Sequence, residues 1–164
     1  MYNQDFYAIK IGDVNSSIVL NIQDEIAEPR SNEVLNLEYE VVNTDGGNRV
    51  DFFATKDQEL FGFQMSVEGL GEVSKAVGSR LSVANENYAN GERGFAMSWN
   101  TDNAQSIKAG ELLFSLYTKG ETSSLKLAGL LKDEAYLSTE EVSDIELTAR
   151  SSQATNPAFE VYQN

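Results

Sequence analysis

The fold class is decided by the stretch Val34-Leu35-Asn36-Leu37-Glu38-Tyr39-Glu40-Val41-Val42, in which apolar and polar side chains alternate. Successive side chains of a β-strand point to opposite faces, so a period of two is typical of a strand buried on one face. The apolar face of this stretch holds Leu35, Leu37, Tyr39 and Val41, and the polar face holds Asn36, Glu38 and Glu40. We therefore expect a long, half-buried strand here.

The same period of two recurs on both sides of this stretch. Towards the N-terminus we predict strands at residues 6–11 and 17–22, followed by a loop over 24–32. Towards the C-terminus, Asp45-Gly46 predicts a hairpin turn. Further strands are expected at residues 49–55, 60–68, 94–100, 110–118, 124–130, 134–137 and 142–149. The predicted inward side chains include Phe61, Phe63, Met65 and Val67, then Phe95, Met97 and Trp99, and finally Ile145 and Leu147.

The remaining stretches are less regular. Residues 73–83 predict a short helix or an irregular strand, and residues 85–92 and 101–109 predict loops. Residues 151–164 are polar and are expected to form a flexible tail or linker. About nine or ten strands without a long helical pattern predict an all-β fold, an antiparallel β-sandwich.

The composition excludes several functions. The chain carries 26 acidic and 12 basic residues, a formal charge of -14, which disfavours binding to nucleic acid and to anionic membranes. It contains no cysteine and no histidine, which removes thiol nucleophiles, disulfides, Cys/His zinc sites and histidine bases. No run of apolar residues is long enough for a transmembrane helix, and no signal peptide is recognisable.

Calcium is the one cofactor that the acidity suggests, because Ca²⁺ prefers oxygen ligands. Asp13 and Asn15 stand two residues apart, as at the start of a calcium loop, and Asn87 and Asn90 lie in an oxygen-rich loop. The alternative is that these side chains satisfy the backbone of local turns. The sequence leaves both interpretations open.

Exposed aromatic rings could stack on sugars, and the candidates are Tyr88, Trp99 and Tyr136. For Trp99 the alternative is a place in the core. Adjacent carboxylates such as Glu140 and Glu141 point to opposite faces of a strand, so they do not form a catalytic pair. We expect no enzyme activity.

The order of short motifs resembles a known family. Residues 61–65 (FGFQM), 95–99 (FAMSW), 110–116 (GELLFSL) and 134–136 (EAY) follow one another as in cohesin-like modules. The resemblance covers residues 30–150 at the level of pattern. It implies a jelly-roll sandwich of about nine strands, related to carbohydrate-binding modules, in which one sheet face receives a dockerin partner.

The stretch Asp5-Phe6-Tyr7-Ala8-Ile9-Lys10-Ile11-Gly12-Asp13-Val14-Asn15 resembles the closing segment of dockerin-like regions in large secreted proteins of the Bacteroidetes. This resemblance implies export to the medium or the cell surface, of the kind served by type IX secretion. It also implies that the chain is a middle piece of a longer protein.

Together these observations predict a dockerin-like remnant at residues 1–16, a cohesin-like sandwich at 17–150 and a tail at 151–164. The expected function is that of a non-catalytic extracellular structural or protein-interaction module. Its expected partner is a dockerin-like segment of the same chain or of another, and Phe6, Ile9 and Ile11 would carry the contact. The alternative is a carbohydrate-binding module that binds polysaccharide.

Overall fold

A computed structural model of the chain describes residues 30–150, which fold into ten strands and one short 3-10 helix. The elements are β1 (Arg30–Thr44), β2 (Gly47–Ala54), β3 (Gln58–Glu68), β4 (Glu72–Gly78), η2 (Asn85–Asn87), β5 (Tyr88–Gly91), β6 (Gly94–Ile107), β7 (Leu112–Lys119), β8 (Lys126–Leu127), β9 (Glu134–Tyr136) and β10 (Val142–Ala149). Within these residues, no helix has the length and apolar character needed to cross a membrane. The predicted all-β fold is confirmed.

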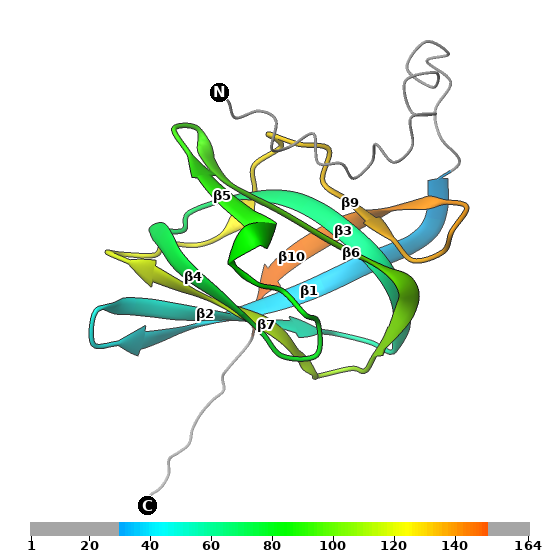
Figure 1. The fold of residues 1–164 in the computed structure, drawn as a ribbon, viewed down its shortest axis with the longest axis horizontal. Coiled ribbons are helices and arrows are strands. Elements are labelled where there is room, and N and C mark those ends of the chain that lie inside the picture. The colour runs from blue at the N-terminus through cyan, green and yellow to red at the C-terminus, as the bar shows by residue number, and fades with distance from the viewer. Residues whose placement is uncertain (1–29, 151–164) are drawn as a thin grey trace, which may run out of the picture.

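The strands form one strongly bent sheet in the order β4-β7-β2-β1-β10-β9-β3-β6-β5, and β8 also pairs with β3. Figure 1 shows that the bend produces two layers, with β3, β5 and β6 in one and β1, β2 and β7 in the other. The three-residue strand β9 joins the layers, because it pairs with β10 on one side and with β3 on the other. All paired strands run antiparallel except β1 and β10, which are parallel.

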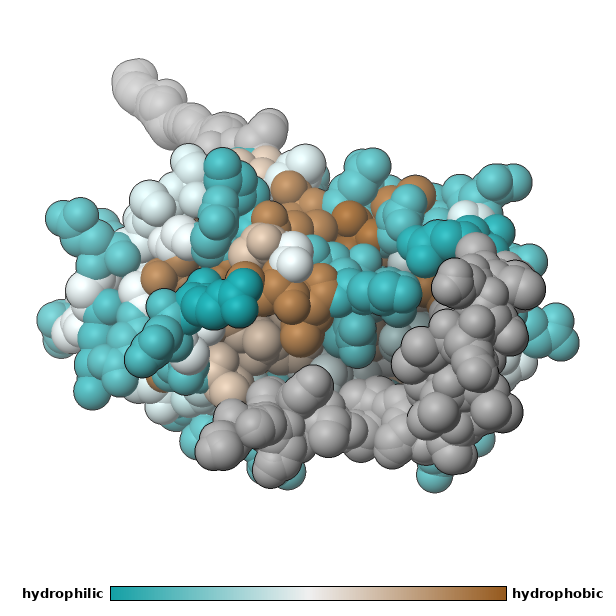
Figure 2. Space-filling model, turned by 90° about the horizontal axis from the view of Figure 1, so that it is seen from above, coloured by the Kyte–Doolittle hydropathy of each residue, from teal (hydrophilic) through white to brown (hydrophobic). Residues whose placement is uncertain are grey.

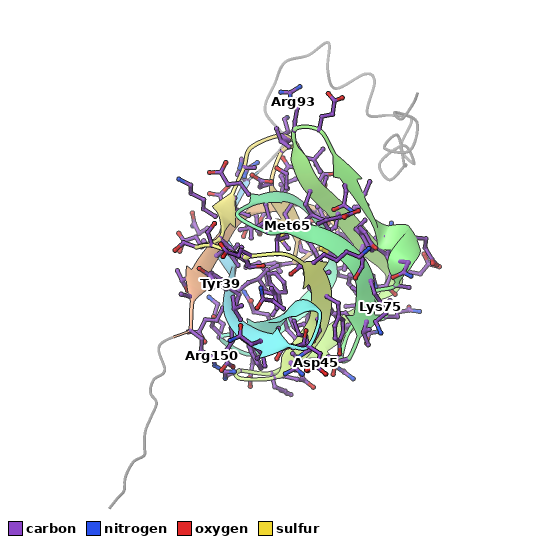
Figure 3. The ribbon with its side chains drawn as sticks, turned by 90° about the vertical axis from the view of Figure 1, so that its left-hand side faces the viewer. Tyr39, Asp45, Met65, Lys75, Arg93 and Arg150 are labelled. Carbon is purple, nitrogen blue, oxygen red and sulfur yellow. The ribbon has the colours of Figure 1, made fainter. Side chains whose placement is uncertain are left out.

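The core lies between the layers. Phe52, Phe114 and Phe63 stack across it, with ring centroids 4.7 Å and 5.9 Å apart, and Trp99 lies 6.2 Å from Phe63. Figure 3 shows Tyr39 and Met65 pointing into the space that the strands enclose. Most of the alternating side chains predicted to face inward thus share one interior, whose burial is the main stabilising term.

The predicted hairpin at Asp45-Gly46 is confirmed, since Thr44 pairs with Gly47 across the turn. The predicted strand at 142–149 matches β10 residue for residue. Val41 is 37% exposed although it was predicted inward, because the pairing of β1 with β10 ends at Tyr39.

Other predictions were wrong in detail. Phe61 is only half-buried, because an irregularity between Leu60 and Gly62 turns Leu60 inward instead. The predicted loop 101–109 is largely strand, since β6 runs to the fully buried Ile107. The ambiguous stretch 73–83 contains β4, and the predicted loop 85–92 contains η2 and β5.

Several predicted segments concern residues that the structure does not describe. The proposed dockerin-like segment 1–16, the strands at 6–11 and 17–22 and the tail 151–164 lie outside the described residues. Of the predicted strand 124–130, only Lys126–Leu127 forms a strand, and residues 128–133 lie outside the sheet.

Candidate functional site

The two asparagines predicted as calcium ligands hold backbone groups. The Asn87 side-chain oxygen accepts the N–H of Ala84 at 2.8 Å, and its amide nitrogen donates to the carbonyl of Ser98 at 3.0 Å. The Asn90 side-chain amide bonds to both backbone groups of Val73. Its oxygen accepts the Val73 N–H at 3.1 Å, and its nitrogen donates to the Val73 carbonyl at 2.8 Å. The geometry therefore gives both side chains a structural part.

These bonds close one side of the sandwich. Strand β4 pairs only with β7 within the described residues, so its other edge faces β5 and η2 across the gap between the layers. Asn90 covers Val73, and the side-chain oxygen of Asn85 accepts the N–H of Ala76 at 2.8 Å. Edge strands that keep free N–H and C=O groups invite pairing with other chains, and these amides occupy the groups instead of a strand.

Over residues 30–150, no three His, Cys, Asp or Glu side chains come together as a metal site would require. Asp13 and Asn15 lie outside the described residues, as do Phe6, Ile9 and Ile11.

The three aromatic candidates do not share an outer face. Trp99 is 5% exposed and donates its ring N–H to the Ser82 hydroxyl at 3.2 Å, so it belongs to the core. Tyr88 lies in the gap between the layers, with its hydroxyl 3.4 Å from the carbonyl of Val73, and burial raises its pKa. Tyr136 follows the inward Ala135 on β9 and therefore points outward, with its hydroxyl donating to Glu134 at 3.3 Å.

The outer face of the β3, β6 and β5 layer carries mostly small side chains. Strand alternation places Gln64, Ala89, Ala96 and Ser98 on it, because their neighbours along each strand point into the core. Three of these four side chains are small, so little rises above the backbone. Such a surface allows another protein to approach closely.

Residues 128–133 lie over this face and are fastened to the fully buried Ser66 of β3. The Ser66 hydroxyl accepts the N–H of Leu130 at 2.8 Å, and the Ser66 carbonyl accepts the N–H of Ala128 at 2.8 Å. Asp133 accepts the Ser66 N–H at 2.8 Å, and Gln64 donates to the carbonyl of Lys132 at 2.8 Å. Bonds at both ends and in the middle hold the segment in one conformation.

This segment presents two leucines, Leu130 and Leu131, which are both half-buried. A methyl group built on Gly94 would come within 3.2 Å of Leu130, so that leucine packs against the end of β6. Figure 2 looks onto this layer and shows a band of hydrophobic residues between hydrophilic ones. We call Gln64, Ala89, Ala96 and Ser98 together with the two leucines the β3–β6 face.

The opposite face has a different character. On β2, the Arg49 guanidinium donates to both oxygens of Asp51 at 2.8 Å and 3.0 Å, which raises the pKa of Arg49. Ser115 of β7 donates to the same carboxylate at 2.6 Å. The ammonium of Lys75 lies 4.6 Å above the ring of Tyr117. These charged groups are matched among themselves, and the same layer carries Val77, whose side chain is 41% exposed.

A third cluster fixes the start of β1. Arg30 contacts the carboxylates of Asp144 and Glu134, which sit opposite each other on β10 and β9. The hydrogen bond to Asp144 and the charges of both carboxylates raise the pKa of Arg30. The cluster ties β1 to the strand that joins the two layers.

Comparison with protein-family models, curated proteins and solved structures gives no match to this chain.

Sequence reasoning missed the residues that build the β3–β6 face. Neither Ser66, inside a predicted strand, nor Asp133 was a candidate site residue in the sequence. Their contact joins residues 67 positions apart, and no local pattern signals it.

Proposed function

We propose that residues 30–150 form a non-catalytic, extracellular protein-interaction module that binds its partner through the β3–β6 face. The observation that carries the proposal is the pair of leucines held by Ser66 above a layer of mostly small side chains. A few residues carry most of the binding energy of an interface, and binding costs less when these residues are already ordered.

The chemistry of the chain supports a binding function. The sequence supplies no imidazole and no thiol. On the opposite face the charged side chains pair with one another, as the bidentate bond between Arg49 and Asp51 shows. An apolar feature on an outer surface is then the strongest indication of a contact site.

The partner that we propose is a dockerin-like segment. Residues 5–15 resemble such a segment, and Phe6, Ile9 and Ile11 would supply apolar side chains to meet Leu130 and Leu131. The same resemblance supports a place outside the cell, at the surface or in the medium.

The experiment is a binding titration with a labelled peptide of residues 1–16 and a chain that lacks those residues. The deletion removes none of the described residues, since β1 begins at Arg30. We expect Leu131→Asp to weaken binding at least tenfold, about 1.4 kcal/mol, because a carboxylate replaces an apolar contact.

The matched control is Val77→Asp, which puts the same charge on the opposite layer at a side chain that is 41% exposed. It should leave the affinity unchanged. Equal weakening by both substitutions, or a peptide that does not bind, would contradict the proposal.

A further inference from the structure

The side-chain amide of Asn90 is chemically reactive, and it also holds the backbone of Val73. The residue after it is Gly91, and this is the one Asn-Gly pair in the whole sequence. A glycine has no side chain to hinder its backbone nitrogen, so that nitrogen can attack the preceding side-chain amide. Asn48 and Asn87 precede Arg49 and Tyr88, whose side chains hinder the same reaction.

We propose that Asn90 is a site of spontaneous deamidation, and that its conversion to aspartate unlocks the edge of β4. The Gly91 nitrogen bonds to Cγ of Asn90, and the bond from Cγ to Nδ2 breaks. Ammonia leaves with the proton of the Gly91 nitrogen, and a cyclic imide remains. Water then opens the imide at either carbonyl, which yields aspartate or isoaspartate.

The position in the fold makes the reaction accessible. Strand β5 has four residues and pairs with β6 alone among the described strands, and both Asn90 and Gly91 are exposed. The two residues end the strand at a tight hairpin, where Gly91 faces Gly94. Attack requires the Asn90 amide to release Val73, so the reaction proceeds from brief openings of the hairpin.

The product cannot restore the lost contact. A carboxylate still accepts the N–H of Val73, but its second oxygen now faces the Val73 carbonyl, to which the Asn90 amide had donated at 2.8 Å. Two acceptors then oppose each other and no donor joins them. In the isoaspartate product the backbone gains a methylene group, which shifts the register of β5. Either product leaves part of the β4 edge unpaired.

The test compares three full-length chains: wild type, Gly91→Ala and Asn90→Asp. The alanine variant is a matched control, because a methyl group on Gly91 meets only the Gly94 carbonyl oxygen at 3.4 Å, an ordinary contact. Each chain is incubated at mildly alkaline pH, and deamidation is located by peptide mass spectrometry. Hydrogen exchange of the Val73 amide then reports the state of the β4 edge.

We expect wild type to deamidate at Asn90 faster than at any other asparagine among residues 30–150, and Gly91→Ala to abolish this. In Asn90→Asp, loss of the bond to the Val73 carbonyl and the opposition of two acceptors there should open the β4 edge more often, so the Val73 amide should exchange roughly tenfold faster than in wild type. The difference should shrink below about pH 4, where the carboxyl group is protonated and can donate again.

Two results would overturn the proposal. One is deamidation of wild type that favours Asn48 or Asn87, or that persists in Gly91→Ala. The other is exchange at Val73 that is the same in Asn90→Asp and in wild type. Neither result would touch the proposed function, because Asn90 faces the gap between the layers and not the β3–β6 face.

Discussion

Replacing Ser66 by alanine should loosen the segment that carries the two leucines. Ser66 is 0% exposed, and its hydroxyl accepts the N–H groups of Leu130 at 2.8 Å and Leu131 at 3.4 Å. Alanine keeps the backbone bonds to Asp133 and Ala128 but leaves the Leu130 N–H without its acceptor. This bond is partly buried, and leaving its donor without an acceptor costs about 1–3 kcal/mol of unfolding free energy.

Urea unfolding measures this cost. With a typical dependence of about 1–3 kcal/mol per molar urea, a loss of about 2 kcal/mol moves the midpoint down by roughly 1 M. Hydrogen exchange adds a local readout, since the Leu130 amide should lose protection in Ser66→Ala even under conditions where the sandwich stays folded.

Ser98→Ala is the matched control. Ser98 lies on the same outer face and contributes its carbonyl, not its hydroxyl, to the bond with Asn87. It should change stability by no more than about 0.5 kcal/mol. If Ser66→Ala and Ser98→Ala unfold at the same urea concentration, with the Leu130 amide equally protected in both, the account of the segment is refuted.

Three further substitutions test the rest of the fold. Gly47→Ala should cost at least about 2 kcal/mol in denaturant unfolding, because φ is +155° there and the new methyl group would overlap the backbone of β7; a smaller loss would contradict that geometry. Tyr39→Phe should cost about 1–2 kcal/mol by the same assay, since the buried N–H of Leu125 loses the hydroxyl that accepts it at 3.0 Å; unchanged stability would show that the bond contributes nothing. Burial, and then the charge of Glu72, raise the pKa of Tyr88, so the folded state holds this proton more tightly than the unfolded state and stability falls as the pH rises above about 10. Thermal unfolding across that range should show a shallower loss for Tyr88→Phe than for wild type, and parallel curves would disprove the assignment.

The sequence predicted those strands whose alternation is strict. Leu35, Leu37 and Tyr39 on β1 and the bounds of β10 follow from local pattern, because each strand buries one face against the same core. The turn at Asp45-Gly46 was predictable for a similar reason, since its chemistry is local.

The failures share a physical cause. Phe61 was placed inward because a period of two was extended through a bulge, and bulges depend on the partner strand. The sequence left Asn90 open as a calcium ligand or a residue of a local turn, and could not predict that its amide bonds to Val73 on another strand. A side chain that bonds to a distant backbone group leaves no local sequence pattern, and residues 128–130 were wrongly predicted as strand for the same reason.

The most direct test of the proposed function is to map where the partner touches the molecule. An isotope-labelled chain lacking residues 1–16 is titrated with the peptide of those residues, and backbone amide shifts are followed by nuclear magnetic resonance. We predict that the largest changes fall on the β3–β6 face, at Gln64, Ala96, Ser98 and Leu131. Changes centred instead on Arg49, Lys75 and Val77 of the opposite layer would contradict the account.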